Sequence, residues 1–451
     1  MKASEPTLGS QFHVLITGAN SGLGFATCCR LIDEFLDTRQ EYDSITLVLT
    51  TRDSRKGDST ITRLQKHVDK LPRSKRPDGT ARVSYQAEIV ALDSLLSVQR
   101  LSKKLLTQLP KLDVIILNAA YGGWIGVDYW MSMRQSMSSF VESVTWPTFK
   151  LSDIGKTTKS QLPPKDSRVR RKQKTTHDSD GEYNEPPLGE VFCINVFGHY
   201  LLSHNLSPLL RNTHSFSGEK GRIIWISSVE TETVIDAFST DDIQGVVSPF
   251  AYEISKRLSD ILALTSNLPA TKPWVDSFLS GPEPVLIPDS DGEGQIGVSR
   301  PRIYVTHPGI CSTEILPVLW ILGVIKVIMF YIARWLGSPW HPVDTYKGAC
   351  APVWVALCPQ AQLDEMEAKE GAGKWGSSTD RWGNERVRRT EVGGWGWGGI
   401  VGEEVQRAGR IRGAKALTQE AREDFEGLGR ECWRQMEELR KEWEERLHGL
   451  D

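Results

Sequence analysis

The chain has 451 residues, with 54 Lys or Arg and 57 Asp or Glu, so its formal net charge at pH 7 is −3. This balance argues against a nucleic-acid-binding protein, and Met1 to Ser10 is too short and polar for a secretory signal peptide. Seven cysteines without C-x-x-C or Cys/His spacing indicate free thiols in a reducing compartment.

The first feature along the chain is a strand, a glycine-rich turn and a helix. Residues 12–16 are an apolar run that predicts a buried strand, and residues 25–32 have a helical pattern. Gly18 permits a tight turn, Gly22 lets the backbone approach a pyrophosphate, and Gly24 allows helix and strand to pack closely. Unpaired N–H groups at the helix start complete a phosphate cradle. The residues expected to contact a dinucleotide here are Gly18, Asn20, Ser21, Gly22, Leu23 and Gly24.

Strand and helix patterns alternate after this turn. A helical period spans residues 95–109, and apolar runs predict further strands at residues 44–50, 82–87, 114–117, 223–226 and 302–306. Continuous apolar strands between helices predict an α/β fold, a doubly wound parallel sheet of the Rossmann type with helices on both faces.

The end of the second strand bears on the choice of dinucleotide. It reads Leu49-Thr50-Thr51-Arg52, with no acid to bond a ribose 2′-hydroxyl. Arg52 can instead pair with a 2′-phosphate, whereas Asp53 is expected to point elsewhere. NADPH is therefore favoured over NADH.

A pair of residues with acid–base chemistry lies far downstream. Tyr252 and Lys256 are four residues apart, which places them on one face of a helix. A cation beside a phenol lowers the phenol pKa, so proton exchange near neutral pH becomes feasible. By itself this spacing more often marks a surface pair of Tyr and Lys on a helix.

Four motifs in order resemble the short-chain dehydrogenase/reductase family. They are residues 17–24, Asn118-Ala119-Ala120, the strand at 223–228 that ends in Ser227-Ser228, and Tyr252-x-x-x-Lys256. The resemblance covers roughly residues 10–360. Two departures, Ala120 in place of glycine and Ala91 where the family has an aspartate with Asp93 two residues on, are expected to weaken cofactor affinity.

The resemblance implies roles for individual residues. Tyr252 protonates a carbonyl oxygen as hydride arrives, and Ser228, rather than Ser227, binds that oxygen. Lys256 bonds the nicotinamide ribose, and Asn195 holds a proton-relay water beside it. Asn118 lines the adenine-ribose side, and residues 307–313 close over the nicotinamide. The cofactor contacts implied by the resemblance are Asn118, Tyr252, Lys256, Cys311 and Thr313.

Within the family, one branch matches over most of the length. Residues 118–126, 145–147, 249–257, 307–311 and the tail around 429–433 are similar to the fungal 3-keto-steroid reductases of ergosterol biosynthesis. This resemblance implies NADPH-dependent reduction of the 3-ketone of a C4-demethylated sterol to the 3β-alcohol. It also implies the cytoplasmic face of the endoplasmic reticulum membrane or a lipid-droplet surface, and association with other C4-demethylation enzymes.

Without the resemblance, the residues predict only a carbonyl reductase that acts on a hydrophobic substrate. Two alternatives therefore stay open. The first is a reductase or dehydrogenase for retinoid-like or secondary-metabolite carbonyls. The second is a catalytically weak scaffold in a sterol-demethylation assembly.

Length alone predicts about three domains. The motif order instead predicts one core over residues 10–360, with insertions near 130–186 and 266–300. Residues 361–451 follow as a Gly/Trp-rich segment and a C-terminal amphipathic helix. Thr418 is expected to cap that helix, whose apolar stripe docks on its own domain.

Three stretches break the alternation. The basic run at 168–174 is expected to be a solvated loop rather than a lipid-headgroup contact. Residues 268–300 predict a flexible surface loop. Residues 370–403 predict an irregular segment packed by its tryptophans.

Residues 317–336 form an apolar run whose length is comparable to that of a membrane-spanning helix. The run is long and apolar but interrupted by Pro317, Lys326 and Arg334. A buried or lid helix and an interfacial helix are both compatible with it, and a spanning helix is the least favoured. Aromatic residues that could anchor an interfacial helix are Trp320, Tyr331, Trp335 and Trp340.

Overall fold

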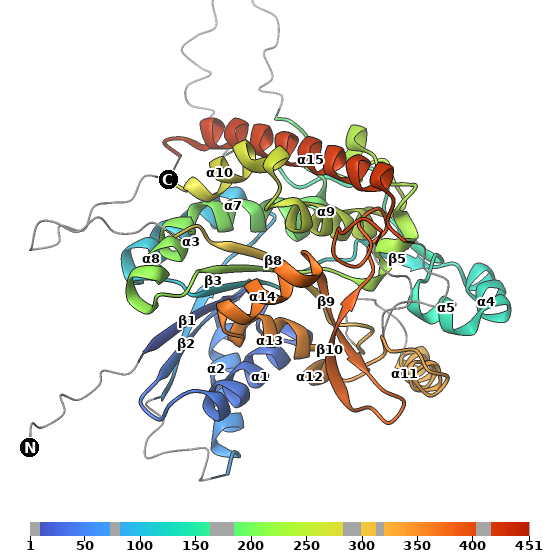
Figure 1. Ribbon diagram of the computed structural model, residues 1–451, viewed down its shortest axis with the longest axis horizontal. Coiled ribbons are helices and arrows are strands. Elements are labelled where there is room, and N and C mark those ends of the chain that lie inside the picture. The colour runs from blue at the N-terminus through green and yellow to red at the C-terminus, as the bar shows by residue number, and fades with distance from the viewer. Residues whose placement is uncertain are drawn as a thin grey trace, which may run out of the picture.

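A computed structural model describes residues 10–72, 82–162, 185–282, 299–312, 320–402 and 416–450. Its centre is an eight-stranded sheet in the order β10-β9-β8-β7-β4-β1-β2-β3 (Figure 1). Every neighbouring pair is parallel except β9 and β10. The strands are β1 (Gln11–Ile16), β2 (Ser44–Thr51), β3 (Val83–Ile89), β4 (Val114–Leu117), β7 (Arg222–Ile226), β8 (Arg302–His307), β9 (Lys374–Thr379) and β10 (Glu385–Thr390).

Helices cover both faces of the sheet, which confirms the predicted doubly wound α/β fold (Figure 1). One face carries α1 (Gly22–Thr38), α2 (Ser54–Asp69), α12 (Thr345–Gly348), α13 (Cys350–Leu357) and α14 (Gln360–Glu370). The other carries α3 (Leu95–Gln108), α7 (Gly198–Asn205), α8 (Ser207–Ser217), α9 (Ala251–Thr265), α10 (Lys272–Ser280) and α15 (Gln419–Leu447).

The apolar strands explain this arrangement. Successive side chains of a strand point to opposite faces, so a strand buried on both sides needs an unbroken apolar run. In β1, Leu15 packs into the core under α3 and α7, whereas Val14 and Ile16 pack into the core under α1 and α13.

The expectation of an irregular segment over residues 370–403 is wrong for its first half, which forms β9 and β10. Strand β9 pairs in parallel with β8, and β10 returns beside it. Gly376 is required at this point because a Cβ there would lie 2.3 Å from Nε2 of His307. Local propensity misses these strands because β8 supplies the hydrogen-bonding partner. In the second half, Trp395 and Trp397 are buried among turns, as expected.

The expectation of a loop over residues 268–300 is also wrong in part. Residues 272–280 form α10, which buries Val275, Phe278 and Leu279 against the core. The remainder from 283 to 298 lies outside the described residues, as does the basic run at 168–174.

The C-terminal helix confirms the prediction made for it. Thr418 Oγ1 accepts a hydrogen bond from the Ala421 N–H at the start of α15. Its apolar stripe packs on α9 and α10 of the same chain (Figure 1). Gly429 allows this close packing, since a Cβ there would lie 2.5 Å from Cγ2 of Thr265. The buried members of the stripe are Phe425, Cys432, Met436, Trp443 and Leu447.

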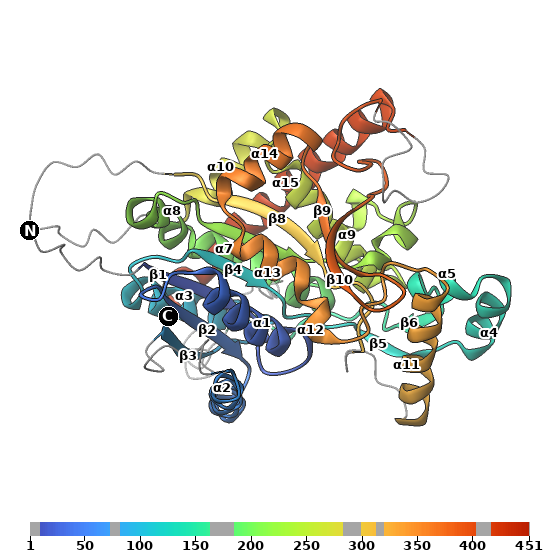
Figure 2. The same cartoon turned by 60° about the horizontal axis from the view of Figure 1, so that its bottom comes forward.

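A smaller layer lies beyond the carboxyl ends of the strands (Figure 2). It contains an antiparallel pair of strands, the two helices between these strands, and a helix from the apolar run at 317–336. Within the described part of the chain, no helix combines the length and apolarity needed to cross a bilayer. Its elements are β5 (Trp124–Val127), β6 (Lys150–Ser152), α4 (Tyr129–Ser138), α5 (Phe140–Thr145) and α11 (Trp320–Trp335).

Short helical turns complete the connections. They are α6 (Glu190–Phe192), the π-helix η3 (Cys193–Phe197), and the 3₁₀ turns η4 (Val229–Val234), η5 (Thr240–Asp242) and η6 (Pro269–Thr271).

Candidate functional site

The glycine-rich turn after β1 is held from beneath by Asn118, the first residue after β4. The Asn118 side chain donates to the Thr17 carbonyl at 2.9 Å, and its N–H donates to Thr17 Oγ1 at 2.8 Å. Gly18 has φ +65°, and a Cβ at Gly24 would lie 2.2 Å from the Gly18 oxygen. Both positions therefore require glycine. The Ser21 side chain does not cap α1, which leaves first-turn N–H groups available to an anion.

A cavity of about 1090 Å³ opens above this turn, at the carboxyl ends of the parallel strands. The turn, strand ends and helix α9 come from distant parts of the chain, and the cavity brings them together. Predicted residues that line it are Gly18, Asn20, Ser21, Gly22, Leu23, Gly24, Arg52, Asn118, Ser228, Tyr252, Lys256 and Cys311. Thr313 lies outside the described residues.

Positive charge gathers at the β2 end of the cavity. Arg52 lines it, and so do Lys56 and Arg63 of α2, which sequence reasoning missed. Lys56 lies in the first turn of α2, and no spacing rule pointed to it. Asp53 accepts a hydrogen bond from the Arg55 N–H and so caps α2, away from the cavity as expected. This donor set fits a phosphate-bearing dinucleotide, and it includes no acid at the end of β2.

The other end of the dinucleotide cleft holds Ser228, Tyr252 and Lys256. Tyr252, on α9, shares a hydrogen bond with Ser228 beyond the end of β7. Nζ of Lys256 lies 5.6 Å from the Tyr252 ring centre and donates to the Ile226 carbonyl at 2.7 Å. Ser227 instead turns inward and donates to the Lys256 carbonyl at 3.3 Å. The geometry thus favours Ser228 over Ser227 as the partner of Tyr252.

Burial sets the protonation states of this cluster. The pKa of Tyr252 is raised by burial and by the nearby carboxylates of Glu230 and Glu253. The prediction of a lowered Tyr252 pKa is therefore wrong for this structure, because desolvation of the phenolate is the largest effect on it. Burial also lowers the pKa of Lys256 to about 8, helped by Lys374 and opposed by Asp260. At neutral pH the phenol keeps its proton beside a serine hydroxyl, an arrangement suited to protonating an oxygen.

Asn195 lies in the π-helix η3, and its side chain bonds to neighbouring protein groups. Its Oδ1 accepts from the Tyr121 N–H at 2.7 Å, and its Nδ2 donates to the Tyr121 carbonyl and Ser255 Oγ, both at 3.0 Å. The amide thereby anchors the loop that contains Tyr121, and the role of Asn195 in holding a relay water stays a prediction. The π-bulge itself was not detectable from residue pattern.

A buried histidine joins η3 to the glycine-rich turn. Burial lowers the pKa of His199 to about 3, so its ring is neutral. Nδ1 lies 3.1 Å from the Asn195 carbonyl and Nε2 lies 2.8 Å from Thr17 Oγ1. With the carbonyl accepting only, Nδ1 carries the proton and the threonine hydroxyl donates to Nε2. Both ends of the site are thus linked through the core.

The layer beyond the strand ends builds the second half of the cavity. The rings of Trp124 and Tyr252 are 4.8 Å apart, and Nζ of Lys150 lies 4.0 Å from the Trp124 ring centre. Lys150 is buried and forms ion pairs with Glu230 and Glu253. Sequence reasoning missed the role of Lys150, because no motif marks the insertion that contains it. The apolar walls include Trp124, Val127, Pro147, Phe149, Met329 and Phe330.

Comparisons with known proteins show what this chain is similar to. No protein-family model matches the chain. It is 46% identical over 456 residues to 3-keto-steroid reductase erg27 of Aspergillus fumigatus, covering 98% of this chain and 96% of that protein. It is 38% identical over 480 residues to 3-keto-steroid reductase ERG27 of Gibberella zeae, covering 96% and 94%. A short-chain type dehydrogenase/reductase from Mycobacterium ulcerans is a structural neighbour at 13% identity and TM-score 0.41, covering 78% and 86%.

Gly24→Ala tests the cradle. The added Cβ must displace the Gly18 carbonyl and so distort the cradle, and a nicotinamide dinucleotide should then bind roughly ten- to hundredfold more weakly by calorimetric titration, a loss of ~1.4–2.8 kcal/mol. Gly427→Ala is the matched control, because a Cβ in that part of α15 meets nothing within 4 Å. Equal NADPH affinities in the two variants would contradict the assignment.

Proposed function

Because this chain belongs to the 3-keto-steroid reductases of the short-chain dehydrogenase/reductase family, we propose that it reduces the 3-ketone of a C4-demethylated sterol to the 3β-alcohol with NADPH. The names of the relatives supply the steroid 3-ketone. The observation that carries the proposal is the position of Tyr252 and Ser228 between a phosphate cradle and an apolar chamber. A rigid hydrophobic substrate suits such a chamber.

The chemistry follows from the protonation states. Bound NADPH supplies a hydride to the carbonyl carbon. Ser228 Oγ and the Tyr252 hydroxyl are neighbours that can both contact the carbonyl oxygen, and the phenol, whose pKa is raised, donates the proton. Lys256 provides a buried positive charge one helical turn away. The complete cluster weighs against the alternative of a non-catalytic scaffold.

The preference for NADPH rests on charge. Arg52, Lys56 and Arg63 line the end of the cavity at β2, where an NADH-specific site would carry an acid. Arg63 is fixed, since it donates to the Asn20 carbonyl at 2.8 Å and lies 3.7 Å above the Phe25 ring. Arg52 is exposed and reaches the cavity from the end of β2.

Turnover of a 3-keto sterol with NADPH is the direct test. The wild-type protein should form the 3β-alcohol, detected by mass spectrometry. Tyr252→Phe should lose about a hundredfold or more in kcat, since it removes the proton donor and leaves the ring. NADPH affinity should stay within a few-fold. Tyr252→Phe activity above about a tenth of wild type would contradict this role.

Arg52→Ala tests cofactor selection. Losing a charge-assisted bond of about 1.5–3 kcal/mol should raise the KM for NADPH roughly ten- to hundredfold and leave the KM for NADH nearly unchanged. Arg55→Ala is the matched control, because Arg55 is an exposed cation three residues away that does not line the cavity. Equal effects of Arg52→Ala on the two cofactors would refute the selection by charge.

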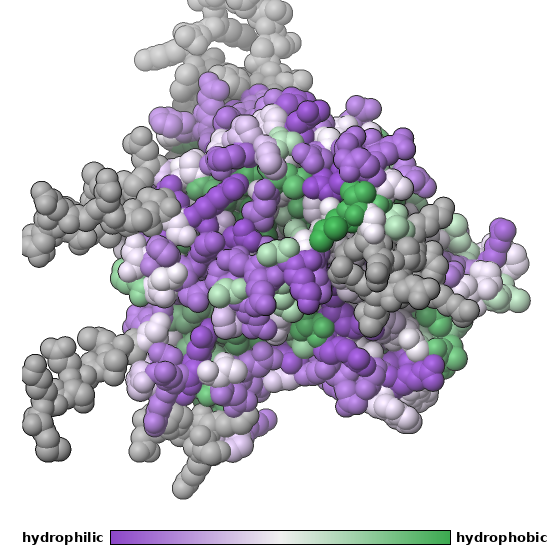
Figure 3. Space-filling view, in the orientation of Figure 1, coloured by the Kyte–Doolittle hydropathy of each residue, from purple (hydrophilic) through white to green (hydrophobic). Residues whose placement is uncertain are grey.

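We further propose that α11 holds the enzyme at a membrane surface and forms the sterol entrance. Phe330 and Ala333 pack against Val144 and Trp340, while Val324, Ile328 and Trp335 of the same helix are 53%, 53% and 60% exposed. Hydrophobic residues also reach the surface at the right-hand edge of Figure 3, near α11 and α5 of Figure 1. The surface proposed is the cytoplasmic face of the endoplasmic reticulum or a lipid droplet, where association with other C4-demethylation enzymes would pass on the substrate.

Replacing Val324, Ile328 and Trp335 with serine should abolish flotation with phosphatidylcholine vesicles, because the exposed apolar face is lost. The KM for the sterol should rise more than the KM for a small soluble ketone. Trp382→Ser, at an 87% exposed position between β9 and β10, is the control and should float normally. A wild-type protein that does not bind vesicles would refute the membrane role and leave α11 as a lid.

A further inference from the structure

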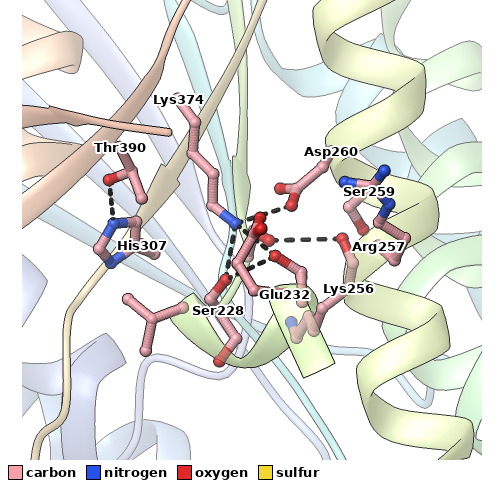
Figure 4. Close-up of polar contacts among 12 residues, drawn as sticks. Ser228, Glu232, Lys256, Arg257, Ser259, Asp260, His307, Lys374 and Thr390 are labelled. Carbon is pink, nitrogen blue, oxygen red and sulfur yellow. Dashed lines mark hydrogen bonds and ion pairs between the residues drawn. The ribbon is translucent and has the colours of Figure 1, made fainter. Parts of the chain in front are cut away.

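A group of buried charges lies next to the backbone of Ser228 (Figure 4). Its centre is Lys374, the first residue of β9. Nζ of Lys374 donates to the Ser228 carbonyl at 2.6 Å, to Thr231 Oγ1 at 3.0 Å and to Asp260 Oδ2 at 2.7 Å. An ammonium has three N–H donors, and all three are used. The side chains of Lys374 and Asp260 are 1% and 0% exposed.

The same cluster reaches Lys256 from behind. Asp260 follows Lys256 by one turn of α9, and its charge raises the pKa of Lys256, whereas the charge of Lys374 lowers it. Lys256 in turn holds the Ile226 carbonyl, two residues before Ser228. Two lysines from different elements therefore hold two carbonyls at the end of β7, and Asp260 interacts with both lysines.

Other titratable groups on the neighbouring elements lie near Lys374 or Asp260 (Figure 4). From α9, Arg257 donates to the Gly393 carbonyl at 2.7 Å, and from η4, Glu232 accepts from the Gly393 N–H at 3.2 Å. Burial raises the pKa of Glu232 and lowers that of His307 on β8. His307 is neutral, since it accepts from the Gly309 N–H and bonds Thr390 with its other nitrogen.

Packing alone does not account for this pair. Burying a lysine and an aspartate costs desolvation energy that an apolar pair of similar volume avoids. Neither Lys374 nor Asp260 lines the cavity, so neither contacts substrate. Lys374 instead donates to the backbone carbonyl of Ser228, and the charges of Lys374 and Asp260 both act on Lys256.

We propose that Lys374 is a positioning residue for the reduction: it fixes Ser228 through its carbonyl, and Asp260, which pairs with Lys374, offsets the effect of its positive charge on Lys256. This inference deepens the proposed reductase function and rests on it. The residue comes from β9, outside the four motifs of the family.

The test compares Lys374→Met, Asp260→Asn and the double variant in the pH dependence of kcat for the 3-keto sterol. Lys256 must be protonated, so activity falls as pH rises through its pKa. Removing the positive charge of Lys374 should move this alkaline limb upward by about one pH unit, and Asp260→Asn should move it downward by a similar amount. The alkaline limb of the double variant should lie between those of the two single variants. In both variants that lack Lys374, kcat should fall about tenfold, because Ser228 loses its anchor.

Lys111→Met is the matched control. Lys111 and Asp113 form another buried pair at 2.7 Å, at the amino end of β4 and far from the cavity. Its loss should lower the melting temperature without moving the alkaline limb. An alkaline limb that stays in place in both single variants would show that Lys374 is merely structural and overturn the proposal. If a single variant does not fold, the double variant decides, and wild-type kcat in it would overturn the proposal.

A second readout separates this inference from the proposed function. NADPH affinity, measured by fluorescence at several pH values, should weaken as Lys256 loses its proton, with a midpoint that shifts in the same directions. If the wild-type protein fails to reduce the sterol but these midpoints shift, the proposed substrate is wrong and the role of Lys374 stands. If turnover occurs but neither the alkaline limb of kcat nor the pH midpoint of NADPH affinity shifts, the proposed substrate is right and the proposed role of Lys374 is wrong.

Discussion

The carboxyl ends of the parallel strands lie at one edge of the sheet, and everything in the site depends on this constraint. The turn after β1, the charged end of β2, Asn118 after β4 and Ser228 after β7 are far apart in sequence, yet they share one cavity. Hydrogen bonds across the sheet set the positions of the strand ends. A few side-chain hydrogen bonds then suffice to align the groups of the site. The clamp of Asn118 on the Thr17 carbonyl is one example.

Burial is the second control on the chemistry. Tyr252 is almost fully removed from water, so its phenol is held protonated, and the same burial lowers the pKa of Lys256 to about 8. Nearby charges then add to or oppose the effect of burial on these two pKa values. Glu230 and Glu253 favour the protonated phenol but are themselves neutralised in part by Lys150. The site is thus a balance of buried charges rather than a simple Tyr–Lys pair.

The sheet and the outer layer have separate tasks. The core positions the groups that a dinucleotide needs, whereas β5, β6, α5 and α11 form the apolar chamber beside Tyr252. The added strands β9 and β10 support the site from the other side. Through Lys374 they hold Ser228, and through Thr390 they hold His307 at the start of the Pro308-Gly309 turn.

Short-range pattern was enough to predict the strand–turn–helix cradle, the alternation of strands and helices, and the last helix, and the family resemblance added Asn118, Ser228 and Cys311 among the residues that line the cavity. These features depend on neighbours within a few positions, such as Gly18 and Gly24 or Tyr252 and Lys256. The tertiary structure alone decided the strands β9 and β10, the partners of Asn195 and the role of Lys150. It also reversed the expected effect on the Tyr252 pKa, because burial is a property of the packed chain. Lys374 meets Ser228 across 146 residues and Thr17 meets His199 across 182, and no local pattern encodes such contacts.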